Sequence, residues 1–295
     1  MTAFFQLLFR FLSVLPLPLL HAFGWVLGWL TFLASPRYRR RLFAHARLAG
    51  YPRSVALGSV AESGKLVAEL PRLWLGRPVH VDWDGVAHVE EAMAHGDGLL
   101  YLTPHLGCFE VTAQLVAQRF GERMPITVLY RPARQPWLRE LMEARNRPGL
   151  HTAPTTLAGV KQLIKALKQH QAVGLLPDQV PPSGQGVWAP FFGRDAYTMT
   201  LSARLAQTGG ARVVLIWGER LSWGRGYRAR VRPFMADGDG QLSSDPQQAA
   251  RQINQAMESL VKECPTQYLW SYDRYKAPAG LSHAARLDAE RAQRT

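Results

Sequence analysis

The sequence is poor in cysteine, and this scarcity limits the compartments and the folds to consider. Only two of its 295 residues are cysteine, Cys108 and Cys264, which is too few for a disulfide framework. We therefore expect a reducing compartment for the folded part. Charged residues make up 19% of the chain and hydrophobic ones 47%, which excludes a disordered protein. The length suits one large domain or two small ones.

Acidic residues are scarce as well, with 22 Asp and Glu against 35 Lys and Arg, so the formal charge is +13. Such a charge favours an anionic partner, which includes nucleic acid, a phospholipid surface, an acidic carrier protein or an acidic substrate. Six arginines follow the most apolar part of the chain directly: Arg37, Arg39, Arg40, Arg41, Arg47 and Arg53. This placement is typical of membrane proteins, so we expect lipid and no nucleic acid as the partner.

The most apolar part is residues 3–35, which contain only two ionisable side chains. The stretch 11–33 is long enough to cross a bilayer, which takes ~20 residues, but Pro16 and Pro18 would kink or break a helix there. A cleaved signal peptide fits poorly, because a basic n-region is lacking. We predict that residues 1–35 are a membrane anchor, spanning or re-entrant, with the rest of the chain cytoplasmic. The alternative is a buried pair of amphipathic helices.

Past this segment, a helical part precedes a part in which strands and helices alternate. Residues 36–75 have apolar positions at helical spacing, with an end expected near Pro71. Strands are predicted at 79–83, 98–103, 126–130, 172–176, 212–219 and 227–234. Helices are predicted at 88–96, 108–120, 136–146, 156–170, 198–208 and 246–263. Residues 177–195, rich in Pro and Gly, are predicted to be a loop.

This alternation predicts an α/β domain with a mainly parallel sheet flanked by helices, because strands are separated by helices of about 10 to 15 residues. We place this domain at residues 36–280, between the anchor and a polar C-terminal tail at 281–295. Ligands of open α/β sheets bind at the carboxyl ends of the strands. Three polar clusters follow predicted strands: "TPHLGCFE", "YRPAR" and "PDQ". We therefore expect one site at this edge of the sheet.

The cluster "TPHLGCFE" has the residues of a general base. His105 ends a predicted strand, Gly107 permits a tight turn, and Glu110 falls in the first turn of the next helix. The carboxylate of Glu110 can then meet one imidazole nitrogen, which orients His105 and leaves the other nitrogen to accept a proton. The chain lacks a G-x-S-x-G motif, so the proton is expected to come from a hydroxyl of the substrate itself. The alternative is a structural histidine before a capped helix.

The pattern H-x4-[DE] behind a hydrophobic, basic anchor resembles acyltransferases that acylate lipid hydroxyls. The glycerol-phosphate type usually carries Asp at the second position and a later E-G-T-R motif, and this chain has neither. It looks instead like the late acyltransferases of lipid A biosynthesis, the lauroyl/myristoyl family of Gram-negative bacteria. The resemblance rests on five motifs behind the anchor, in this order: "PHLGCFE", "VLYRP", "GLLPDQ", "PFFG" and "QYLWSYDRYK".

This resemblance implies transfer of an acyl chain from acyl carrier protein to a hydroxyl of a lipid A precursor. The reaction is expected at the cytoplasmic face of the bacterial inner membrane, with no metal and no organic cofactor. Arg131 would bind a phosphate or the oxyanion, although a surface ion pair is the alternative. Asp178 would orient a base or a cation, or cap the turn that it shares with Gln179. Both are predicted substrate-site residues.

Three further residues belong to this predicted binding site. Phe191 and Phe192 would line an acyl channel or contact lipid, and packing on the core is the alternative. Arg274 would meet phosphates or the acidic carrier, and a solvated basic face is the alternative.

Rival chemistries remain open at this point. Cys108 could act as a nucleophile through a covalent thioester, although its apolar neighbours favour a packed small residue. A metal site at His105, Cys108 and Glu110 has no matching second pair of ligands. A phospholipid-type acyltransferase is one further alternative. A non-enzymatic basic protein that binds membrane surfaces is another, but it leaves the polar clusters unexplained.

Overall fold

The computed structural model describes residues 2–130, 133, 135, 147–234 and 242–280. Its central element is a seven-stranded sheet in the order β1-β9-β8-β2-β5-β3-β4. The strands are β1 (Val81–Asp84), β2 (Leu99–Leu102), β3 (Ile126–Tyr130), β4 (Leu150–Pro154), β5 (Ala172–Leu175), β8 (Arg212–Arg220) and β9 (Tyr227–Pro233). All neighbours are parallel except β8 and β9, which are antiparallel. The predicted α/β fold with a mainly parallel sheet is confirmed.

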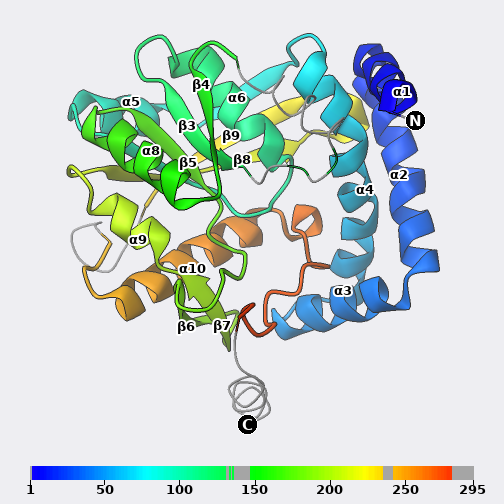
Figure 1. The fold of residues 1–295 in the computed structure, drawn as a ribbon. Coiled ribbons are helices and arrows are strands. Elements are labelled where there is room, and N and C mark those ends of the chain that lie inside the picture. The colour runs from blue at the N-terminus through cyan, green and yellow to red at the C-terminus, as the bar shows by residue number, and fades with distance from the viewer. Residues whose placement is uncertain (1, 131–132, 134, 136–146, 235–241, 281–295) are drawn as a thin grey trace.

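Helices surround this sheet (Figure 1). They are α1 (Thr2–Val14), α2 (Leu17–Ala34), α3 (Pro36–Leu48), α4 (Arg53–Leu75), α5 (Val86–Ala94), α6 (Phe109–Phe120), α8 (Leu157–Lys168), α9 (Leu201–Ala206) and α10 (Pro246–Glu263). The first four lie together at one side, where α2 runs alongside α4 (Figure 1). Pro16 separates α1 from α2, as expected for a residue without a backbone N–H.

Side chains of β2 alternate between two cores, one on each face of the sheet. Leu99 and Tyr101 pack with α5 and α6. Leu100 and Leu102 point the other way and pack with α8, α9 and α10. All four are buried. Because both faces of this strand are covered, its carboxyl end, which leads to His105, is held firmly in place.

The segment predicted as a loop at 177–195 needs correction. It contains the strand β6 (Gly186–Phe191) and leads into β7 (Arg194–Met199), and the two form an antiparallel hairpin. Phe192 and Gly193 connect them, both with positive φ, which is the backbone that a two-residue hairpin turn requires. The isolated hairpin also tolerates its proline, Pro190, because it has free edges.

Smaller corrections concern helix ends and one strand. Pro71 lies inside α4, and the helix continues to Leu75. The helix predicted at 198–208 is only the six-residue α9, because β7 occupies its first residues. Strand β4 was not predicted. The helix predicted at 136–146 and the tail at 281–295 lie outside the described residues.

Candidate active site

The turn that follows β2 places His105 at the carboxyl edge of the sheet. Gly107 has a φ of +59°, and a Cβ there would lie 2.1 Å from the carbonyl oxygen of Gly218 in β8. The turn can pass this close to β8 only because Gly107 has no side chain. The backbone N–H of Cys108 donates to the same Gly218 oxygen at 2.8 Å. The tight turn expected at Gly107 is thus present and is anchored to a neighbouring strand.

The carboxylate that holds His105 belongs to Asp178, which follows β5. Nδ1 of His105 lies 2.6 Å from Oδ1 of Asp178, and the His105 backbone N–H donates to Oδ2 at 2.9 Å. Asp178 is only 2% exposed. Burial alone would raise its pKa, but the charge of the imidazole and the two hydrogen bonds from His105 hold the pKa below its ordinary value. An ionised Asp178 keeps the proton on Nδ1, which leaves the Nε2 lone pair available.

The second ring nitrogen of His105 faces Gln179. The amide nitrogen of Gln179 lies 2.9 Å from Nε2 and, with Nδ1 protonated, donates to it. The segment that carries both residues is held by Tyr272, whose hydroxyl accepts from the backbone N–H of Val180 at 2.9 Å. An acceptor hydroxyl that approaches Nε2 must therefore displace or join the Gln179 amide.

Glu110 lies in the first turn of α6, where the sequence predicted it. Its Oε2 accepts a hydrogen bond from Nε1 of Trp74 in α4 at 3.2 Å. The hydrogen bonds of the His105 ring run to Asp178 and Gln179. Glu110 as the residue that orients His105 therefore stays a prediction, while its place beside the same cavity as His105 is clear.

A cavity of about 360 Å³ opens between the sheet and α6 beside His105. The lining includes six polar side chains: Thr103, His105, Glu110, Thr112, Thr155 and Gln179. The remaining lining is largely apolar: Tyr101, Phe109, Ala113, Val116, Ile126, Val128, Leu129, Gly174, Leu175, Leu176, Val180, Met199 and Ile216. A largely apolar cavity that contains one histidine and a few other polar groups suits a ligand with a hydrocarbon part and one reactive end.

Three of the other predicted binding residues, Phe191, Phe192 and Arg274, are not part of the lining of this cavity. Phe191 and Phe192 contact each other and the aromatic rings of Tyr268 and Trp270 within the core. Arg274 is 2% exposed and is held by β7. Its guanidinium donates to the carbonyl of Tyr197 and to the hydroxyl of Thr198, both at 2.7 Å. Arg131 lies outside the described residues. The roles of these four residues stay predictions.

Two contacts at the site were missed. Tyr268 donates its hydroxyl to Oδ2 of Asp178 at 3.3 Å, and Trp74 donates to Glu110 as described above. Tyr268 belongs to the quoted motif "QYLWSYDRYK", so a signal existed for it. No signal in the sequence pointed to Trp74, because its contact with Glu110 depends on how α4 packs on α6.

Cys108 is an unsuitable nucleophile in this geometry. Its side chain is fully buried, and burial together with the nearby Glu69 carboxylate raises the pKa of the thiol well above its ordinary value. Among the described residues, no group of three or more His, Cys, Asp and Glu side chains gathers as a metal ion would need.

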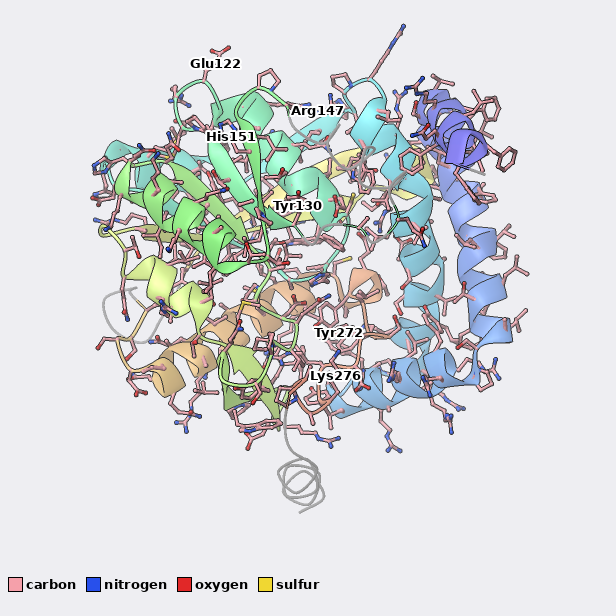
Figure 2. The ribbon with its side chains drawn as sticks, viewed as in Figure 1. Glu122, Tyr130, Arg147, His151, Tyr272 and Lys276 are labelled. Atoms are coloured by element: carbon pink, nitrogen blue, oxygen red, sulfur yellow. The ribbon has the colours of Figure 1, made fainter. Side chains whose placement is uncertain are left out.

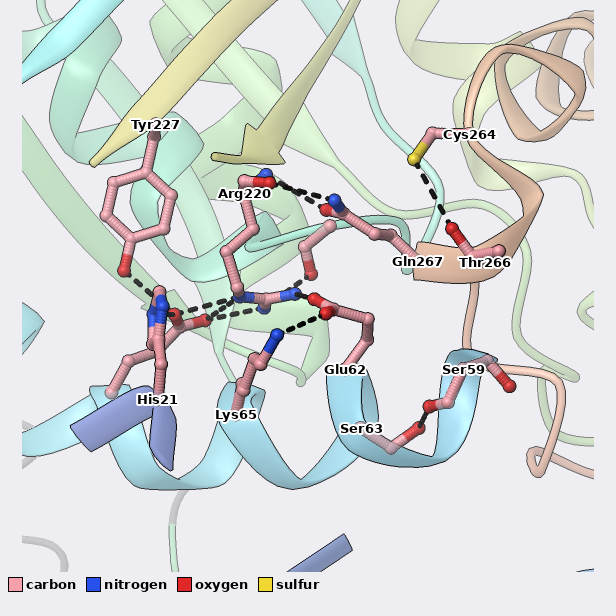
Figure 3. Close-up of polar contacts among 12 residues, drawn as sticks. His21, Ser59, Glu62, Ser63, Lys65, Arg220, Tyr227, Cys264, Thr266 and Gln267 are labelled. Carbon is pink, nitrogen blue, oxygen red and sulfur yellow. Dashed lines mark hydrogen bonds and ion pairs between the residues drawn. The ribbon is translucent and has the colours of Figure 1, made fainter. Parts of the chain in front are cut away.

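A buried ionic cluster contacts the turn at Gly107 (Figure 3). Arg220 of β8 donates three hydrogen bonds of 3.3 Å or less to Glu69 in α4, two to Oε1 and one to Oε2. It also donates to Glu62 at 2.8 Å. Its Nη2 donates to the carbonyl of Gly107 at 3.1 Å. His21 of α2 and the hydroxyl of Tyr227 complete the cluster at Glu69. The turn that carries His105 is therefore tied to α4 and to α2.

The site therefore combines a histidine paired with a buried carboxylate at the edge of a parallel sheet and a largely apolar cavity next to it, in an α/β fold. The chain belongs to the bacterial lipid A biosynthesis acyltransferase family, whose model matches residues 7–277. The family resemblance predicted from the motifs is thereby confirmed.

Individual relatives agree with this family. The chain is 27% identical to a lipid A biosynthesis acyltransferase of Haemophilus influenzae over 63% of its own length and 56% of that protein. It is 28% identical to the lipid A biosynthesis lauroyltransferase of Escherichia coli, over 67% of its own length and 62% of that protein. The chain is also 27% identical to the lipid A biosynthesis myristoyltransferase of Escherichia coli, over 64% of its own length and 57% of that protein. The matches thus span less than two thirds of these relatives.

Proposed function

We propose that this protein is an O-acyltransferase that moves a fatty acyl chain from acyl carrier protein to a hydroxyl of a lipid A precursor. The observation that carries the proposal is the His105–Asp178 pair, with its 2.6 Å contact, whose histidine lines a largely apolar cavity. Family membership supports the substrate class. The net charge of +13 suits an acidic carrier protein and a phosphorylated lipid.

The reaction is a single displacement on the donor thioester. Nε2 of His105 takes the proton of the acceptor hydroxyl as the oxygen attacks the thioester carbon. The carbon–sulfur bond then breaks, and the imidazolium returns the proton to the leaving thiolate. Asp178 stabilises the transient imidazolium, because it is ionised and in contact with Nδ1. The developing oxyanion needs a donor, for which Arg131 or backbone amides are our candidates.

Glu110 is the second carboxylate of this proposal. Its position at the cavity, in the first turn of α6 and five residues after His105, supports a role in orienting His105 or the acceptor once Gln179 has moved off Nε2. The acyl chain would occupy the apolar part of the cavity, which begins beside His105 and has Val116, Ile126 and Ile216 in its lining.

The proposed location is the cytoplasmic face of the bacterial inner membrane. α2 is long and apolar enough to cross a membrane by length and composition. The arginines that follow it support a cytoplasmic domain under the rule that basic residues flank the cytoplasmic end of apolar segments.

Mass spectrometry of lipid A tests the proposed function. Cells that lack the protein should accumulate a lipid A precursor short of one acyl group, and His105→Ala should fail to restore it. His151→Ala is the matched control, because His151 is an exposed histidine on β4 (Figure 2). An unchanged lipid A profile in the cells without the protein would contradict the proposal that a lipid A precursor is the substrate. A change confined to glycerophospholipids would favour the phospholipid-type alternative.

A further inference from the structure

One face of α2, its inner face, packs closely on α4. This packing argues against α2 as a membrane helix that stands apart from the rest of the protein. Gly24 and Gly28 of α2 face Gly64 of α4. A Cβ on Gly64 would lie 2.0 Å from the carbonyl oxygen of Gly24, and a Cβ on Gly28 would lie 2.2 Å from that of Val60. The two backbones are therefore in direct contact over more than one turn of each helix. α2 is built into the body of the protein along its length (Figure 1).

A buried polar contact fastens the same face. Nε2 of His21 lies 3.1 Å from Oε2 of Glu69, and both residues are buried. The pKa of Glu69 is held well below its ordinary value: burial opposes this, but the charge of Arg220 and the hydrogen bonds from His21 and Arg220 outweigh it. Detaching α2 would remove one of these partners and open the buried cluster of Figure 3 to solvent or lipid. If α2 crossed a bilayer apart from α4, Glu69 would lose its contact with His21 and the buried charges would be exposed.

The outer face of α2 has the opposite character. Leu19, Phe23, Val26, Leu30 and Leu33 recur at spacings of four, three, four and three residues, so they form one stripe. Their side chains are 46 to 67% exposed. α1, which precedes α2, has six further exposed apolar side chains: Phe4, Phe5, Leu7, Leu8, Phe11 and Val14. Exposed apolar side chains in such number mark an interaction site.

A loop from a distant part of the sequence joins this surface. Trp223 lies in the turn between β8 and β9, is 88% exposed, and has a φ of +59°. This backbone is strained for a large side chain, and such strain is kept where it serves a purpose. The next residue, Gly224, touches the start of α2, because a Cβ on it would lie 2.4 Å from the nitrogen of Pro18. An exposed tryptophan thus lies next to a residue that touches the start of α2.

Basic residues border the same surface. Arg10 on α1 and Arg225 beside Trp223 are exposed, as are Arg37 and Arg40 of α3. Arg39 donates to the carbonyls of Phe32 and Leu33 and so closes the end of α2 with a positive charge. Tryptophan and arginine at the border of an apolar surface are the pattern of a segment at the bilayer interface, where the arginines meet anionic headgroups.

We propose that α1, the outer stripe of α2 and Trp223 form one membrane-facing surface that lies in the plane of an anionic bilayer. On this proposal α2 inserts its outer stripe into the acyl boundary without crossing the membrane, because its inner face stays on α4. The occupant is a phospholipid surface, as the basic border indicates. The inference refines the membrane location proposed above, but it does not depend on acyl transfer, and its tests read membrane contact alone.

The first test places a probe at Trp223. Purified Trp223→Cys in a Cys264→Ser background is labelled with a polarity-sensitive fluorophore and mixed with phosphatidylethanolamine/phosphatidylglycerol vesicles. The emission should shift to the blue, and nitroxide-labelled lipid should quench it. Leu157→Cys is the matched control, because Leu157 is 83% exposed but lies on α8, across the molecule from α2 (Figure 1). A Trp223 probe that stays as water-exposed as the Leu157 probe while the protein pellets with vesicles would overturn the proposal, as would an absence of vesicle binding.

The affinity for vesicles gives a second reading. Trp223→Ala should weaken partitioning to these vesicles by roughly tenfold, which is the effect of losing one large apolar side chain from a bilayer contact. Leu157→Ala should leave it unchanged. Replacing phosphatidylglycerol with phosphatidylcholine should weaken the binding of both proteins, because the basic border then lacks anionic headgroups. Equal binding of Trp223→Ala and wild type to the vesicles would contradict the proposal that Trp223 is part of the membrane-facing surface.

The third test separates an in-plane helix from a spanning one. Single cysteines are placed at Thr2 and at the exposed Ser244 of the domain, again with Cys264→Ser, and reacted with a membrane-impermeant thiol reagent in sealed inner-membrane vesicles of known orientation. An in-plane α2 keeps both positions on one side, so both should react in the same vesicles. Reaction of the two from opposite sides would show that α2 crosses the bilayer and would overturn the proposal. Loss of acyl transfer in any variant would bear only on the proposed function.

Discussion

Replacing Asp178 by asparagine tests the part of the site that the fold alone brings together. The carboxylate contacts Nδ1 of His105 at 2.6 Å and the His105 backbone at 2.9 Å, in a buried position. Asparagine keeps the size but removes the charge, and its amide can donate to Nδ1. The proton then moves to Nε2, which can no longer act as a base. We expect kcat/KM to fall by ~10²- to 10⁴-fold, the usual contribution of a positioned general base, with little change in KM.

Glu110→Gln is the matched comparison for this variant. The carboxylate of Glu110 accepts from Trp74 at 3.2 Å. Asparagine at 178 and glutamine at 110 each remove one negative charge near His105. The assay is mass-spectrometric detection of acyl transfer from acyl carrier protein to a lipid A precursor, with circular dichroism as the control for folding. A folded Asp178→Asn enzyme with near-wild-type turnover would refute the reasoning. A comparable loss of turnover in Glu110→Gln would support a role for both carboxylates in the reaction. A loss of turnover in Glu110→Gln alone would assign the orienting role to Glu110.

The same aspartate makes a prediction about acid stability. The folded-state pKa of Asp178 lies below its ordinary value, which is ~3.9 in an unfolded chain. Its ionisation therefore stabilises the fold above about pH 4, and this stability is lost as the pH falls through the folded-state pKa. Asp178→Asn should be less stable than wild type at neutral pH, and the difference should narrow below pH 4 in urea unfolding curves. A difference that is constant from pH 7 to pH 3 would contradict this linkage.

Two further predictions concern the thiol and the contact between α2 and α4. Cys108→Ala should keep most of the turnover, and wild type given donor without acceptor should gain no acyl mass in intact-protein mass spectrometry. A stable acyl adduct that is absent in Cys108→Ala would establish the covalent route. Gly28→Val should destabilise the protein by ~1–3 kcal/mol in urea unfolding, because its Cβ would lie 2.2 Å from the Val60 carbonyl. Leu30→Val on the outer stripe should change stability far less, and equal effects would contradict the close packing.

Local patterns in the sequence determined a large part of the fold. The strand before His105, the tight turn at Gly107 and the start of a helix at Phe109 follow from a short apolar run, a glycine and a helical period, all within about a dozen residues. The helix α10 begins and ends where its periodicity does, with Asp245 capping its first turn. The hairpin β6–β7 was hidden, because its Pro and Gly content is also that of a loop and only pairing between the two strands makes it a sheet.

Only the tertiary structure decided which carboxylate contacts His105. The sequence places His105 after one strand and Asp178 after another, 73 residues later, and it offered Glu110 as the nearer carboxylate. Which strands lie side by side depends on how their apolar faces pack together, and this is not encoded in any local spacing. In the fold, β2 and β5 pair with Leu102 opposite Leu175, so the residues that follow them meet at one edge. The same holds for α2: its composition predicts an apolar helix, but only its packing on α4 separates the inner glycines from the outer stripe.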